Sequence, residues 1–76
     1  MARITGISET WVSVTLTQDE IWQCIGGSVL ITAEASPATE DGIRLDQLSG
    51  KEIANGTTVR YRRFGGTAAI IAREAL

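Results

Sequence analysis

A chain of 76 residues forms one domain, and a domain of this size buries only about 60% of its unfolded surface, so its core is small. The net charge is -2, with nine acidic and seven basic residues, which argues against the basic face that a nucleic-acid binder needs. We expect neither a membrane span nor export, because no apolar run approaches about 20 residues and no signal-peptide pattern opens the chain.

Period-two alternation in the first half of the chain predicts β-strands. We expect strands over residues 11–16, 21–25 and 28–34, separated by polar or glycine-rich turns. Gly26-Gly27 lies between two apolar strands and is interpreted as a tight hairpin turn, since glycine accepts the positive φ of such turns. Residues 35–42 hold the only proline and end in Asp-Gly, which predicts a mobile surface loop.

The second half repeats this pattern. Short strands are expected over residues 43–45 and 51–53, and Asn55-Gly56 marks the next turn. The two longest strands, residues 57–64 and 67–74, follow and are joined by a glycine-pair hairpin.

A closing helix over residues 68–76 is the alternative, because this segment is rich in helix formers. The β-branched pair Ile70-Ile71 favours the strand. Turn signals every ~8–12 residues then predict an all-β fold, a small antiparallel sandwich or barrel. We expect residues 11–76 to form this single β domain and residues 1–10 to form an N-terminal arm.

The residues that could carry catalysis lack partners. The chain has no histidine, so a Ser-His-Asp arrangement cannot be built and Cys24 has no imidazole base. Cys24 is better interpreted as a buried structural thiol. Glu40, Asp41 and Asp46 could bind calcium, but their spacing does not match a calcium loop, and solvated turn residues are the alternative. We therefore expect no enzyme activity, no cofactor and no metal.

Three features could support binding to another protein. Arg60 and Arg62 are two apart on one strand and share a face, as a grip on carboxylates or as a solvated sheet face. Trp11 is either a core filler or an interface anchor. Two segments, residues 29–31 and 68–72, are apolar at consecutive positions and so present apolar side chains on both faces of their strands.

One small core cannot cover both faces of these strands, and the sequence predicts no helices that would pack over the second face. The single cysteine and the absence of histidine also leave no disulfide or zinc staple. A homo-oligomer is therefore expected. The predicted interface residues are Trp11, Val29, Leu30, Ile31, Arg60, Arg62, Ile70 and Ile71.

The order of several segments resembles small structural proteins of tailed bacteriophages. These segments are a Trp-led strand, Gly-Ser-Val-Leu-Ile-Thr, a Ser-Pro loop, Asp-Gly-Ile-Arg-Leu, Ile53, Asn-Gly, Val-Arg-Tyr-Arg and Gly-Gly-Thr-Ala, within residues 11–74. Residues 2–9 fit no pattern in the resemblance.

The resemblance implies a virion component, made in the host cytoplasm, that attaches to coat, neck or tail subunits. A capsid decoration or cement protein, often a trimer, is the most specific expectation. The alternatives are a small β-barrel module that binds a ligand or carbohydrate, and an adaptor for one cellular protein.

Overall fold

The computed structural model describes residues 2–38 and 40–76, and these form strands and turns with no helix. Every strand pairing is antiparallel. The strands are β1 (Ala2–Ile4), β2 (Val12–Thr15), β3 (Glu20–Gly26), β4 (Val29–Thr32), β5 (Ile43–Leu45), β6 (Gly50–Ile53), β7 (Thr58–Arg63) and β8 (Ile70–Ala75). The prediction of an all-β fold, a small antiparallel sandwich or barrel, is confirmed in the form of a sandwich.

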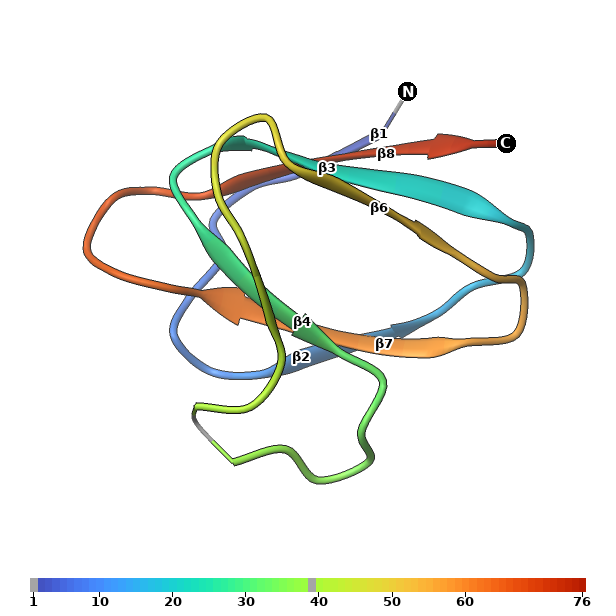
Figure 1. Cartoon of the computed structure of the whole chain (residues 1–76), viewed down its shortest axis with the longest axis horizontal. Helices are drawn as coiled ribbons and strands as arrows, with labels where there is room; N and C mark the ends of the chain where they lie inside the picture. The colour runs from blue at the N-terminus through green and yellow to red at the C-terminus, as the bar shows by residue number, and fades with distance from the viewer. Residues whose placement is uncertain (1, 39) are drawn as a thin grey trace.

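Two four-stranded sheets pack face to face, one in the order β1-β8-β3-β6 and the other in the order β2-β7-β4-β5. Figure 1 shows the first sheet above the second, with β1 and β8 side by side in the upper sheet. Residues 68–76 contain β8 rather than the alternative helix, and Ile71 is fully buried. The β-branched pair in this segment favours the extended backbone.

The core lies between the sheets and follows the predicted alternation. In β3, Trp22 and Cys24 point inward and are fully buried, while Ile21 and Gln23 lie on the outer face. The prediction of a buried thiol at Cys24 is confirmed. The largest fully buried side chains are those of Leu16, Trp22, Val29, Ile31 and Ile71.

The two glycine pairs do not form hairpins, which corrects the sequence prediction. Gly27 adopts the expected positive φ of 61°, but the chain then crosses from β3 in one sheet to β4 in the other. Gly65-Gly66 likewise lies on the crossing from β7 to β8. Among the strands that the structure describes, only β4 and β5 follow each other in sequence and lie in the same sheet. A glycine turn therefore serves as a corner where a strand changes sheet.

Backbone hydrogen bonds extend the β2–β7 and β4–β7 ladders beyond the strand ends and into the crossings. The N–H of Leu16 donates to the carbonyl of Thr57, and that of Gly56 donates to the carbonyl of Leu16, both at 2.9 Å. At the opposite corner the N–H of Phe64 donates to the carbonyl of Ser28, also at 2.9 Å. Backbone groups where these crossings begin and end are therefore satisfied by bonds that continue the β2-β7-β4-β5 sheet.

The N-terminal segment is part of the sheet. Ala2–Ile4 forms β1, which pairs with β8, and Ile7 is buried in the core. The expected arm over residues 1–10 therefore differs from the structure for residues 2–10, while Met1 lies outside the described residues. The reason is that β1 covers an edge of β8 and Ile7 adds apolar surface to a small core.

A single chain covers both faces of β4. Val29 and Ile31 face the core, and Leu30, on the opposite face, is still only 5% exposed. Leu30 stands directly opposite Arg44 and Arg62 in the neighbouring strands, and the aliphatic stems of arginines cover apolar surface. Burial of Leu30 thus needs no second subunit, although the oligomeric state itself stays a prediction.

Candidate functional site

An apolar cleft opens where the two sheets end at β5 and β6. Each of these strands is paired on one side only, and the cleft between them has a volume of about 510 Å³. Its apolar lining includes Ile31, Ile43, Ile53 and Val59. Ile43 is 53% exposed, so part of this apolar surface already faces solvent.

The backbone of β6 presents unpaired groups at the cleft. The N–H of Cys24 donates to the carbonyl of Ser49 at 2.9 Å, so these two residues form a hydrogen-bonded pair of the ladder. Hydrogen-bonded and non-hydrogen-bonded pairs alternate along an antiparallel ladder. Lys51 and Ile53 therefore bond to β3, while the N–H and C=O of Glu52 point toward the open side.

The same reasoning applies to β5. The bond from Phe64 N–H to the Ser28 carbonyl makes these residues a hydrogen-bonded pair of β7 and β4. By alternation Leu30 bonds to β7 and Ile31 bonds to β5. The N–H and C=O of Arg44 then point away from β4. Both strands that flank the cleft thus offer free backbone donors and acceptors.

Lys51 is a cationic residue of the cleft lining. It stands opposite the inward-facing Trp22 in the register of β3 and β6, and it is among the cleft-lining residues. Within residues 2–38 and 40–76, its ammonium group has no hydrogen bond or ion pair. Glu34 and Glu52 also line the cleft. The mouth is therefore charged and the lining apolar, an arrangement suited to binding an amphipathic group.

The predicted arginine pair lies elsewhere, on the outer face of the β2-β7-β4-β5 sheet. Arg62 is only 7% exposed; its guanidinium lies 5.6 Å from the centre of the Trp11 ring and donates to the Arg63 carbonyl at 3.0 Å. Arg60 donates to the carbonyl of Glu34 at 2.9 Å. Both arginines therefore make contacts within the chain, and Arg62 offers little surface to a partner.

The loop between β4 and β5 is fastened to this same face. Figure 1 shows it extending below the sheet, and the indole N–H of Trp11 donates to the carbonyl of Ala38 at 3.2 Å. Asp41 Oδ2 accepts from the N–H of Ala38 at 2.9 Å. The described part of the loop is thus a surface excursion, as predicted, but one tied down by Trp11 and Arg60.

Trp11→Ala is expected to release this loop. Removing the ring takes away the Ala38 contact and the surface under Arg62, so cleavage within residues 33–42 should speed several-fold and the free energy of unfolding should fall by about 2 kcal/mol. Limited proteolysis with mass mapping measures the first effect. Trp11→Phe is the control, since it keeps an aromatic ring but loses the hydrogen bond. Unchanged cleavage in Trp11→Ala would contradict the fastening.

A polar cluster that was not predicted from the sequence joins Glu20 and Trp22 on β3 to Arg73 on β8. The buried carboxylate of Glu20 accepts from Arg73 Nε and Nη2 at 2.9 and 3.0 Å, and from the Trp22 indole at 2.9 Å. The Arg73 guanidinium lies 5.1 Å from the Trp22 ring centre. The hydrogen bonds from Arg73 hold the pKa of Glu20 below its usual value, against the opposing effect of burial. Because its acceptor sites are filled, the cluster is suited to stabilising the fold.

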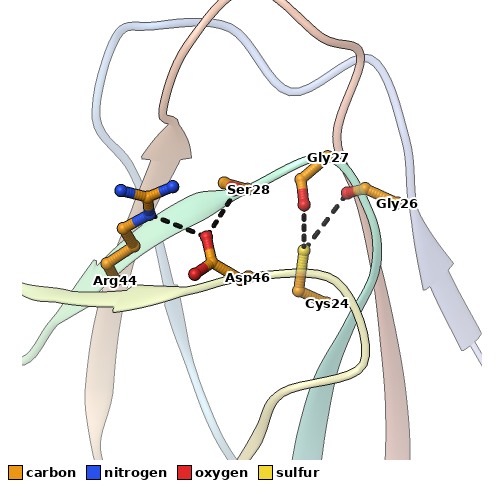
Figure 2. Close-up of polar contacts among 6 residues, drawn as sticks. All are labelled: Cys24, Gly26, Gly27, Ser28, Arg44 and Asp46. Atoms are coloured by element: carbon orange, nitrogen blue, oxygen red, sulfur yellow. Dashed lines mark hydrogen bonds and ion pairs between the residues drawn. The ribbon is translucent and has the colours of Figure 1, made fainter.

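Figure 2 shows another polar group at the β3–β4 corner. Asp46 Oδ1 accepts from Ser28 Oγ at 2.8 Å and from Arg44 Nε at 2.7 Å, and these bonds lower the pKa of Asp46. The thiol of Cys24 donates to the carbonyls of Gly26 and Gly27 at 3.1 and 3.4 Å. Burial raises the pKa of Cys24, which keeps it a neutral thiol. The polar groups of this corner therefore bond to one another and stabilise the crossing from β3 to β4.

The three acidic residues considered for calcium are not brought together. Asp46 binds Ser28 and Arg44, whereas Asp41 binds the backbone of its own loop. In the part of the chain that the structure describes, no cluster of three metal-ligating side chains occurs.

Comparison of the chain with protein-family models, with curated proteins and with solved structures finds no match in any of the three. The resemblance to phage structural proteins therefore rests on the quoted segments alone. Across residues 2–38 and 40–76, no helix has the length and apolar character needed to cross a membrane.

Proposed function

We propose that this protein is a non-enzymatic attachment module that binds another protein through the cleft between β5 and β6. The observation that carries this proposal is the coincidence of an apolar cleft with two half-paired strands. Native β-proteins usually cover or shorten such edges, because exposed strands recruit other chains. An open edge beside apolar surface is suited to docking.

The setting that we propose is a tailed-phage virion, with the chain attached to a coat, neck or tail subunit. The resemblance of its ordered segments supports this setting, and a compact sandwich can staple subunits without any active site. A capsid decoration or cement role is the most specific form of the proposal. In that role the cleft replaces the Arg60 and Arg62 face as the surface that binds the coat.

The test is co-sedimentation with particles assembled without this protein. Wild-type protein is expected to pellet with the particles, and Ile43→Glu, which places a charge in the exposed part of the cleft, should reduce the bound fraction at least tenfold. Val12→Glu is the matched control, because Val12 is also exposed, at 44%, but lies on edge strand β2. Circular dichroism checks that both variants are folded.

Failure of the wild-type protein to bind any particle would overturn the virion setting. Equal loss of binding in Ile43→Glu and Val12→Glu would instead contradict the assignment of the cleft as the docking surface.

A second candidate function is favoured by the size of the cleft. A volume of about 510 Å³ lies within the range of small-molecule pockets, about 300–1,000 Å³. The lining residues that the structure describes include no aromatic side chain, which disfavours a carbohydrate and favours an aliphatic ligand. A small molecule that stays bound in native mass spectra of the purified protein would support this function.

A further inference from the structure

We propose that the occupant of the cleft is an extended peptide segment of the partner protein, added as a strand between β5 and β6. This segment carries aliphatic side chains at alternating positions and a carboxylate that meets Lys51. The inference rests on the proposed attachment function and adds the chemistry of the partner. The added strand would pair with β5 on one side and with β6 on the other, and would thereby connect the two sheets across the cleft.

The backbone groups carry the first step. Arg44 on β5 and Glu52 on β6 each direct an N–H and a C=O toward the open side, as the ladder alternation places them. An extended peptide has donors and acceptors along both of its edges, so one strand satisfies both rows. An aliphatic small molecule fills the cleft but leaves these groups to water.

The side chains of the lining carry the second step. Ile53 and Val59 are buried at 6% and 3% exposure, whereas Ile43 is half exposed at 53%. Apolar surface therefore continues from the core out to solvent along one path. Successive side chains of a strand point to opposite faces, so every second residue of the peptide would cover this path. Valine, isoleucine and leucine match a lining made of aliphatic groups.

Lys51 carries the third step. It is the only lysine of the chain, it lies on the inward-facing side of β6 opposite Trp22, and no described carboxylate pairs with it. A carboxylate on the inward-facing side of the added strand would meet this ammonium group. A partly desolvated ion pair is stronger than one on the open surface.

An inward-pointing lysine on an edge strand has another known use, because it discourages one edge from pairing with another copy. The two roles give opposite results for Lys51→Val. If Lys51 prevents edge-to-edge pairing, its replacement should let the protein self-associate as its concentration rises. If Lys51 binds the peptide, its replacement should lower the affinity for the peptide and leave the protein monomeric.

The experiment is selection of nine-residue peptides from a random library displayed on yeast, against the full chain. Binders that also bind Ile43→Glu are discarded, while Val12→Glu serves as the control that should retain every binder. We expect the surviving peptides to alternate aliphatic and polar residues, with Asp or Glu on the aliphatic side. Amide chemical shifts of the 15N-labelled protein should change along β5 and β6.

A charge exchange then tests the register. Lys51→Glu should weaken a selected peptide roughly tenfold, a loss of about 1.4 kcal/mol, and replacing the acidic residue of that peptide with lysine should restore the affinity. N-methylation of alternate peptide amides should abolish binding by removing donors. Absence of cleft-dependent binders, binders without alternation, or self-association of Lys51→Val with unchanged peptide affinity would each overturn the inference.

These results are separable from those of the particle experiment, because the selection uses the isolated protein. If particle binding depends on Ile43 but the selection yields no peptide, the attachment function is supported and the added peptide strand is contradicted. If the selection succeeds but the protein binds no particle, the added peptide strand is supported and the virion setting is contradicted.

Discussion

Replacing Arg73 with leucine is expected to lower the free energy of unfolding by about 2–3 kcal/mol at neutral pH. The substitution keeps an aliphatic stem but leaves the carboxylate of Glu20, which is 6% exposed, without its guanidinium. Removing one partner of a fully buried pair costs about 3–5 kcal/mol. Because the Arg73 side chain is 24% exposed, water can reach the pair, and we expect a smaller loss.

The same pair should make stability depend on pH in one direction. The folded-state pKa of Glu20 lies below its usual value of 4.5, chiefly through the hydrogen bonds from Arg73. A carboxyl with a depressed pKa contributes stability that is fully present above its unfolded pKa and is lost as pH falls through its folded pKa. The contribution of Glu20 should therefore be present at pH 7 and fade below about pH 4.5.

Urea unfolding of the wild type, Arg73→Leu and Glu20→Gln at pH 7 and at pH 3 measures both effects. Glu20→Gln can still bond Arg73 and Trp22 but cannot titrate, so its stability should change less between the two pH values. Arg44→Leu is the control, since its pair with Asp46 is more than half exposed on both sides and should contribute at most about 1 kcal/mol. Equal losses for Arg73→Leu and Arg44→Leu would contradict a special role for the buried pair.

The strands were predictable from the sequence because each one is defined by local alternation and local turn residues. Trp22 and Cys24 share a face at a spacing of two, and both are buried as that spacing implies. The β-branched pair Ile70-Ile71 likewise favoured a strand over a helix, and the structure has the strand β8 there. Such features depend on neighbours in the sequence, which any single sequence displays.

Which strands pair was less accessible, because pairing depends on contacts distant in sequence. Gly26-Gly27 fits a hairpin and a crossing between sheets equally well, since both need a positive φ. Leu30 suggested a missing subunit, whereas Arg62 from a distant strand lies opposite it. The candidate cleft has the same origin, because Ile31 and Ile53 line it from different sheets.

The Glu20 and Arg73 pair shows the difficulty most clearly. Its members are 53 residues apart, and each is an ordinary charged residue near the end of a strand. Only the pairing of β3 with β8 brings them together. A sequence alone does not distinguish this buried pair from the exposed pair of Arg44 and Asp46, which are two residues apart.

Gly27→Ala is expected to lower the free energy of unfolding by at least about 3 kcal/mol. Two effects add at this corner. Gly27 has a φ of 61°, a left-handed conformation that costs other residues about 1–2 kcal/mol. A Cβ atom would also lie 2.6 Å from the carbonyl oxygen of Ala68, so the backbone of the β7–β8 crossing must move.

The second crossing supplies controls that separate these two effects. Gly65 has a φ of 93° but open space around a Cβ, so Gly65→Ala should lose only about 1–2 kcal/mol. Gly66 has open space and lies outside the left-handed region, so Gly66→Ala should be neutral or stabilise by up to about 1 kcal/mol. Urea unfolding should rank the losses as Gly27, then Gly65, then Gly66. Similar losses for Gly27→Ala and Gly65→Ala would show that conformational strain alone matters, and that the two sheet crossings do not pack against each other as closely as the 2.6 Å approach requires.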